Sequence, residues 1–164
     1  AQLKAGNTVN TMDMLIGRIP GTIGETSVIA ILIGAMILIL LGVITLRIPA
    51  AYLITFAVFM LIFGKEPMNA NYLVAELCGG GLMLGAFFMA TDYATTPINW
   101  RGKLVFAIGC GIITMLIRLF GSLPEGVSYS IVLMNILTPH IESLTRSKTF
   151  GFIKARKERK RSEV

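Results

Sequence analysis

The stretch VIAILIGAMILILLGVITL, residues 28–46, decides the class of fold, because it contains no charged side chain. A helix needs about 20 mostly apolar residues to cross the hydrocarbon core of a bilayer. The whole chain of 164 residues is 54% hydrophobic and only 15% charged, with a mean hydropathy of +0.74. Soluble domains carry about 25% charged residues. The composition therefore predicts a membrane protein.

Four further apolar stretches follow this one and are separated by short loops. The sequence predicts an all-α, polytopic membrane domain over residues 28–145. Residues 1–27 would be an outer segment, and residues 146–164 a basic tail. The five expected transmembrane helices cover residues 28–46, 50–64, 73–90, 103–120 and 126–144.

The distribution of basic residues predicts the orientation of these spans. Eight of the 15 Lys and Arg residues lie in the tail. With five spans, the side that holds the tail also holds Arg47, Arg101 and Lys103, which makes eleven basic residues against four on the other side. Cytoplasmic loops carry an excess of Lys and Arg. We therefore expect the tail in the cytoplasm and residue 1 outside. A nucleic-acid partner is not expected, because no nucleic-acid-binding pattern accompanies the charge.

The third span contains three consecutive glycines, Gly79, Gly80 and Gly81, close to Glu76. Small residues let helices pack closely in lipid, which is one explanation. A broken helix, whose freed backbone groups line a cavity, is the other. The sequence alone leaves both open.

Acidic side chains near the membrane are the candidates for chemistry, because ionisable groups at that depth are costly. Gly24, Glu25, Thr26 and Ser27 resemble a helix N-terminus, which either is simply capped or holds a phosphate. Asp92 lies among four hydroxyl-bearing residues. The inner turn is either an ordinary solvated turn or an oxygen-rich site for a sodium ion or for the polar edge of a ring system.

The last span has an acid at each end. Glu125 follows Pro124 at the outer end, and Glu142 lies next to the single histidine, His140, at the inner end. The 17 residues between the two acids correspond to roughly 25 Å along a helix. They cannot form one catalytic pair, so they either mark opposite ends of an ion path or are solvated span ends.

Several kinds of site are absent from the sequence. It contains no Walker loop, no GxGxxG fingerprint and no zinc-ligand spacing, which argues against nucleotide-binding and hydrolytic enzymes. Cys78 and Cys110 lie inside apolar stretches, where lone cysteines usually behave as buried hydrophobes. The alternative is that Cys78 or Cys110 lies close to the cysteines or the cluster of a partner subunit.

Five sequence blocks resemble the C-terminal half of the RnfD family. They are AQLKAG at residues 1–6, GTIGETSVIAILIGA at 21–35, RIPA at 47–50, FFMATDYATTP at 87–97, and LPEGVSYSIVLMN with a later TP at 123–139. RnfD proteins are the membrane flavin subunits of the Rnf ferredoxin:NAD oxidoreductases. They are similar to the NqrB subunits of the sodium-pumping NADH:quinone oxidoreductases.

This resemblance implies ten transmembrane spans, arranged in two halves of opposite orientation. The five spans predicted here would form one of these halves. It also implies a flavin mononucleotide (FMN) bound to a threonine of a Ser-x-Ala-Thr motif, which family members carry just before AQLKAG and which these residues lack. A second, non-covalent riboflavin is a further expectation. The residues matching the implied flavin pocket are Gly24, Glu25, Thr26, Ser27, Pro124, Glu125 and Gly126.

The family's membrane acids match Asp92 and Glu125. Glu142 stands where the family usually has Asp, and Tyr93 replaces a proline after Asp92, so this chain departs from the family pattern at both places. We expect an ion path along Asp92, Glu125 and Glu142.

The implied function is electron transfer from ferredoxin to NAD, coupled to sodium or proton transport in the inner (cytoplasmic) membrane. The expected partners are other Rnf membrane subunits, the neighbouring covalent-flavin subunit and the N-terminal half of the same protein. The alternatives are a non-redox transporter or channel subunit, in which the acids line a substrate path, and a purely structural membrane scaffold. Bound flavin separates the first alternative from the redox function. The structural scaffold predicts that replacement by the amide is tolerated at all four candidate acids, which are Glu25, Asp92, Glu125 and Glu142.

Overall fold

The computed structural model describes residues 16–17, 27–64, 70–79, 81–121 and 126–145, and these residues form helices without any strand. The helices are α2 (Val28–Leu40), α3 (Arg47–Phe63), α4 (Ala70–Cys78), α5 (Leu82–Leu84), α6 (Trp100–Phe120) and α7 (Val127–Thr145). A π-helical turn, η2 (Gly85–Met89), continues α5. The prediction of an all-α chain is confirmed for these residues.

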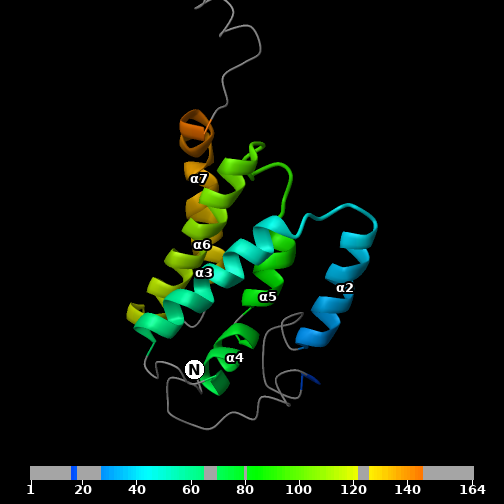
Figure 1. Ribbon diagram of the computed structural model, residues 1–164, viewed down its shortest axis with the longest axis vertical. Coiled ribbons are helices and arrows are strands. Elements are labelled where there is room, and N and C mark those ends of the chain that lie inside the picture. Colours follow the sequence, from blue (N-terminus) through cyan, green and yellow to red (C-terminus); the bar gives the residue numbers. More distant parts are fainter. Residues whose placement is uncertain (1–15, 18–26, 65–69, 80, 122–125, 146–164) are drawn as a thin grey trace, which may run out of the picture.

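The helices run alternately toward the two ends of the molecule (Figure 1). Helices α3, α6 and α7 pack together, and α2 lies against α5 at one side. Aromatic and sulfur-containing side chains fill the space between α3 and α6, including the fully buried Tyr52, Phe56, Phe106 and Cys110. The loops at residues 41–46 and 90–99 lie at the upper end of Figure 1, and α4 lies at the lower end.

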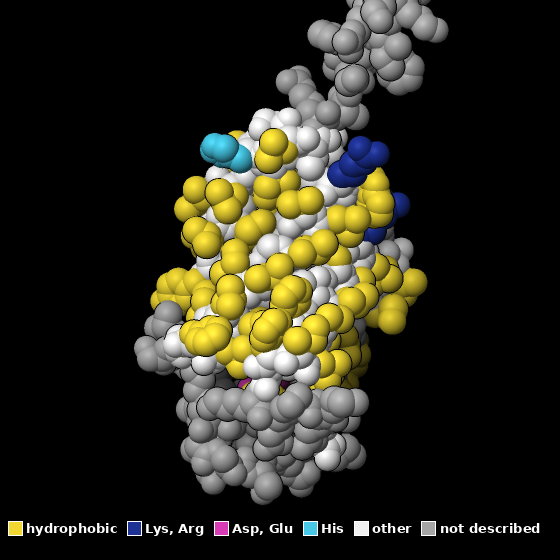
Figure 2. Space-filling model, turned by 60° about the vertical axis from the view of Figure 1, so that its left-hand side comes forward, with side chains coloured by type: hydrophobic (Ala, Val, Ile, Leu, Met, Phe, Trp, Pro, Cys, Tyr) yellow, Lys and Arg dark blue, Asp and Glu magenta, His cyan; other side chains and the backbone are white. Residues whose placement is uncertain are grey.

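The outer surface of the described helices is largely apolar. Figure 2 shows hydrophobic side chains over most of one face between the two ends, with Lys and Arg side chains at the upper end. Helix α2 exposes Ile33, Met36 and Leu40 by 57%, 57% and 79%. Such a surface suits a lipid environment or further membrane helices, because water would not solvate it.

The helices differ in their capacity to cross a bilayer alone. Among the described residues, only α6 is long and apolar enough to do so. A second span is present if α4 and the segment formed by α5 and η2, which are bent relative to each other, are counted as a single span. Helices α2 and α3 are apolar but shorter, with 13 and 17 residues. The number of five spans therefore stays a prediction.

Helix α2 ends at Leu40, before the end of the apolar stretch at residue 46. Gly42 adopts a φ of +72°, a left-handed conformation that glycine favours. The N–H of Val43 donates to the Leu38 carbonyl and the N–H of Gly42 to the Ile39 carbonyl, both at 2.9 Å. This is the Schellman arrangement that closes a helix. Backbone conformation at Gly42, and not hydropathy, sets this boundary.

The third predicted span is broken at its glycines. Helix α4 ends at Cys78 and α5 begins at Leu82, and the two helical segments are bent by 63° relative to each other. Gly81, before α5, has a φ of +66°. The structure has the break that one of the two explanations expects, and the cavity that this explanation places beside it stays a prediction.

Candidate functional site

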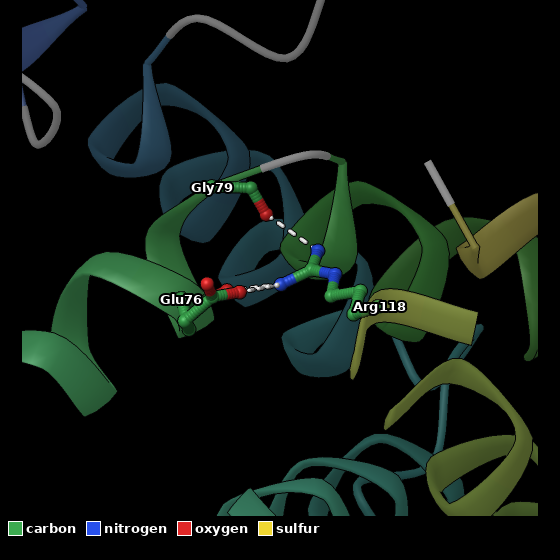
Figure 3. A network of polar contacts seen from close by, with 3 residues as sticks. All are labelled: Glu76, Gly79 and Arg118. Carbon is green, nitrogen blue, oxygen red and sulfur yellow. Dashed lines mark hydrogen bonds and ion pairs between the residues drawn. The ribbon is translucent and has the colours of Figure 1, made fainter. Parts of the chain in front are cut away.

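The most buried charges among the described residues lie at this helix break. Arg118 of α6 and Glu76 of α4 form an ion pair with 3.0 Å between Nη1 and Oε2, and their side chains are only 7% and 14% exposed. Nη1 of Arg118 also donates to the Glu76 carbonyl at 2.5 Å, and Nη2 donates to the Gly79 carbonyl at 2.8 Å. In Figure 3 the guanidinium points at the end of α4 and joins all three oxygen atoms.

The position of Arg118 explains why a cation is tolerated there. The last carbonyl groups of a helix have no partner within it, and the guanidinium hydrogen-bonds two carbonyl groups at the end of α4. Arg118 lies in the last turn of α6, where the helix dipole favours positive charge. Its guanidinium lies over the Phe56 ring, 5.1 Å from the centroid, a favourable cation–π distance.

Asp92 lies in the loop that joins η2 to α6, and its carboxylate is bound to that loop. It accepts hydrogen bonds from the Ala94 N–H at 3.3 Å and from the Thr95 hydroxyl at 3.1 Å. The Asp92 carbonyl accepts a bond from the Thr96 hydroxyl at 2.7 Å. The predicted hydroxyl-rich turn is therefore ordered around this acid, whose side chain is exposed.

Glu142 of α7 binds the same loop from the other side. Its Oε1 accepts a hydrogen bond from the N–H of Ile98 at 2.8 Å. Ile98 directly precedes Asn99, the N-cap residue of α6, so the carboxylate lies at the end of α6 where negative charge is favourable. The structure thus brings Asp92 and Glu142 to one loop, at the end predicted to face the cytoplasm.

Two aromatic contacts fix the surroundings of this loop. The Tyr93 hydroxyl donates to the Val43 carbonyl in the loop after α2. The Arg47 guanidinium lies over the Trp100 ring, 5.8 Å from its centroid. The first contact joins the 90–99 loop to the α2–α3 connection, and the second joins the first residues of α3 and α6.

The predicted flavin-pocket residues lie mostly outside the described residues. Gly24, Glu25, Thr26, Pro124 and Glu125 belong to that group. Ser27 is the N-cap of α2, and its hydroxyl accepts a hydrogen bond from the Ala30 N–H at 3.4 Å. Gly126 precedes α7 and packs against α6, where an added Cβ would lie 2.8 Å from a methyl group of Ile117. Ser27 and Gly126 each lie where a helix begins.

Three hydroxyl groups form a closed cluster between α3, α6 and α7. The Tyr52 hydroxyl lies 2.5 Å from that of Thr114 and 3.2 Å from that of Ser130, and the Thr114 and Ser130 hydroxyls are 2.7 Å apart. Ser130 also donates to the Val127 carbonyl at 2.7 Å. All three residues are fully buried, so the cluster holds the helices together.

The ion pair is not among the predicted site residues. In the sequence, Glu76 stands out only as a neighbour of the glycines, and Arg118 only as a basic residue on the outer side. The signal that could have found them is the opposite charge of two ionisable residues inside apolar spans.

Cys78 and Cys110 are free and buried, and no group of three His, Cys, Asp or Glu residues that could hold a metal occurs among the described residues.

A comparison with models of known families finds one match over residues 1–151, to the NQR2, RnfD, RnfE family. The chain belongs to this family. The family match agrees with the resemblance seen in the sequence blocks.

Curated RnfD relatives match almost the whole chain. One, from Acetobacterium woodii, is named as a subunit of a Na(+)-translocating ferredoxin:NAD(+) oxidoreductase complex, and it is 49% identical over 98% of this chain and 50% of its own length. Another, from Clostridium ljungdahlii, is named as a subunit of a proton-translocating ferredoxin:NAD(+) oxidoreductase complex. It is 42% identical over 84% of this chain and 42% of its own length. The chain therefore spans half or less of the length of these relatives.

The hydrogen bond of Glu142 leads to a prediction about the loop at residues 90–99. Replacing Glu142 by alanine removes the acceptor for the Ile98 N–H, whereas Glu142→Gln keeps an acceptor oxygen without the charge. We expect faster amide exchange at Ile98 in the alanine variant, with a loss of about 1.5–3 kcal/mol of local stability. Hydrogen exchange with mass spectrometry checks this. Equal exchange at Ile98 in the wild type and in Glu142→Ala would contradict it.

Proposed function

We propose that this chain is part of the RnfD-type membrane subunit of an ion-translocating ferredoxin:NAD oxidoreductase complex. The observation that carries the proposal is the match of 98% of the chain, at 49% identity, to a protein named as a subunit of such a complex. The partners would be the other membrane subunits of the complex, the neighbouring covalent-flavin subunit and the N-terminal half of the same protein. The location would be the inner (cytoplasmic) membrane, with the basic tail in the cytoplasm.

The electron carrier would be FMN, with riboflavin as a second flavin. FMN would be attached to a threonine that precedes Ala1 in the parent polypeptide, and it supplies the oxidation and reduction chemistry. Gly24, Glu25, Thr26 and Ser27, together with Pro124, Glu125 and Gly126, would bind and orient it. At the start of α2 the Ser27 hydroxyl itself accepts the Ala30 N–H, which is the simple capping arrangement, so the assignment rests on the resemblance to the family.

The ion path would include Glu125 at the outer end, and Asp92 and Glu142 at the inner end. The support for the inner part is the loop at residues 90–99, which contains Asp92 with its hydroxyl partners and whose Ile98 N–H donates to the Glu142 carboxylate. The relatives named above belong to a sodium-translocating and a proton-translocating complex. Sodium and protons are therefore both candidates for the transported ion.

Amide substitutions in the complete complex test the ion path. Asp92→Asn and Glu142→Gln keep an acceptor oxygen but remove the charge, so we expect ion uptake per NAD reduced to fall at least about tenfold. The measurement is ferredoxin-driven NAD reduction in liposomes, with sodium and pH indicators inside. Ser143→Ala, next to Glu142 on α7 and exposed, is the control and should leave both rates unchanged. Unchanged ion uptake in both amide variants would contradict the proposed path.

A further inference from the structure

We propose that the end of the molecule at which the basic tail begins binds the phosphate groups of anionic phospholipids in the surrounding membrane. This basic end consists of Arg47, Arg101, Lys103 and residues 146–164. The inference rests on the membrane location given in the proposed function, but it depends neither on electron transfer nor on ion transport.

Three helix ends meet at the basic end. Helix α3 begins at Arg47, α6 begins at Trp100 and α7 ends at Thr145. The Arg47 guanidinium lies over the Trp100 ring, and a Cβ added at Gly102 would lie 3.1 Å from Oγ1 of Thr145. Figure 2 shows Lys and Arg side chains at this end of the molecule. The tail, which follows Thr145 directly, therefore begins beside the basic residues of α3 and α6.

Positive charge at the basic end exceeds the negative charge around it. Arg47, Arg101 and Lys103 form no ion pair with any described residue. The carboxylates of Asp92 and Glu142, which lie at the same end, accept hydrogen bonds from the 90–99 loop instead. Residues 146–164 add eight Lys and Arg against two Glu, and six of the eight lie between residues 154 and 161. Clusters of roughly four to eight Lys and Arg beside a transmembrane helix are typical of segments that bind anionic lipids.

The position of Arg47 suits a phosphate group. Its guanidinium carbon lies 5.8 Å from the centroid of the Trp100 ring, and both residues are exposed. This contact restrains the side chain without a carboxylate partner, so the positive charge is not neutralised. A guanidinium carries N–H donors whose geometry matches two oxygen atoms of a phosphate. Arg47 is therefore both ordered and unpaired on the side where lipid head groups lie.

Exposed aromatic and apolar side chains lie at the same end as these charges. Trp100 and Tyr93 are 54% and 69% exposed, and Ile98 and Leu144 are 82% and 86% exposed. Trp and Tyr are enriched where a membrane meets water, because one part of each ring system is apolar and another is polar. A phospholipid offers a charged head group to the cations and apolar chains to the other side chains. An acidic soluble protein would account for the charges alone.

The experiment compares two photoactivatable lipids in liposomes that contain the complete complex. One lipid is a phosphatidylglycerol, which is anionic, and the other is a phosphatidylcholine with the same acyl chains and no net charge. Mass spectrometry after pepsin digestion locates the cross-linked peptides. We expect the phosphatidylglycerol to label residues 92–103 and 146–164 at least about tenfold more than the phosphatidylcholine does. The preference should disappear in about 1 M NaCl, where the screening length is roughly 3 Å.

Two variants test whether the preference belongs to the basic end. Arg47→Gln combined with Arg101→Gln should lower it about tenfold at residues 92–103. Both residues are exposed, so the variant should fold. Replacing the six Lys and Arg residues between 154 and 161 by Gln should lower the preference at the tail. Lys65→Gln, in the connection that follows the other end of α3, is the matched control and should change neither value.

Equal labelling by the two lipids in the wild type at low salt would overturn the lipid site, and it would leave an acidic protein surface as the partner of the basic end. A preference that both variants keep would also overturn it. The positive-inside bias alone predicts no preference for an anionic lipid at these residues. Labelling needs neither ferredoxin nor NAD, so failure of the oxidoreductase proposal would show only in a separate assay of NAD reduction by the same liposomes.

Discussion

Replacing Arg118 by methionine is expected to lower the free energy of unfolding by about 3–5 kcal/mol, the usual cost of breaking a buried ion pair by removing one partner. The substitution leaves the Glu76 carboxylate buried without its counter-charge. It also removes the hydrogen bonds to the carbonyl groups of Glu76 and Gly79. Methionine keeps much of the apolar packing on Phe56, so the loss reports mainly the polar contacts. Denaturant titration of the purified parent protein in mixed micelles measures it.

Arg47 provides the matched control for this substitution. Its guanidinium also lies over an aromatic ring, that of Trp100, but the residue is exposed. Exposed cation–π contacts contribute about 0.5–1 kcal/mol, so Arg47→Met should cost no more than that. Equal losses for the two methionine variants would show that the polar contacts at the helix break do not stabilise the protein.

Replacing Gly111 by alanine is expected to destabilise the contact between α3 and α6 by about 1–3 kcal/mol, the typical cost of overpacking. A Cβ at this position would lie 2.9 Å from the Cβ of Thr55 and 3.0 Å from the backbone carbonyl oxygen of Tyr52. Neither atom can move without shifting α3. The same mixed-micelle titration measures the loss.

Gly109, two residues earlier in the same helix, is the control. An added Cβ there would meet only the end of the Met134 side chain, at its terminal methyl group and sulfur. Methionine is flexible and can turn away, and alanine favours a helix over glycine by about 1 kcal/mol. Gly109→Ala should therefore be neutral or stabilising. The same gain in helix propensity applies to Gly111→Ala, so the difference between the two variants measures the overpacking at Gly111. Similar losses for both alanine variants would contradict the close α3–α6 contact.

Much of the fold could be predicted from the sequence, because hydropathy reports directly on helices in lipid. The uncharged residues 28–46 predicted a helix, and the three glycines indicated a break as one of two possibilities. The end of α2 at Leu40 escaped the hydropathy pattern, because it depends on the left-handed backbone of Gly42. Pro49 lies inside α3, which begins at Arg47 and not at residue 50, because the first turn of a helix tolerates proline.

The candidate site was harder to predict, because its contacts join residues far apart in the chain. Glu76 and Arg118 are 42 residues apart and Glu142 and Ile98 are 44 apart, and no local pattern pairs them. The predicted importance of Asp92 and Glu142 rested on their type, on their depth and on the resemblance to the family. The structure adds that both carboxylates accept hydrogen bonds within one loop. Amide variants remove the charge but keep an acceptor oxygen, whereas alanine variants remove both. The two kinds of variant therefore separate the effect of the charge from that of the hydrogen bond.

We propose that this chain belongs to a flavin-carrying redox subunit, and the fluorescence of its parent polypeptide tests this directly. The complex would be purified, separated on a denaturing gel and viewed under ultraviolet light, and its peptides would then be analysed by mass spectrometry. We expect a fluorescent band and an FMN mass on a threonine-containing peptide that precedes Ala1. A dark band from the intact complex would contradict the covalent flavin and favour a non-redox transporter or channel subunit.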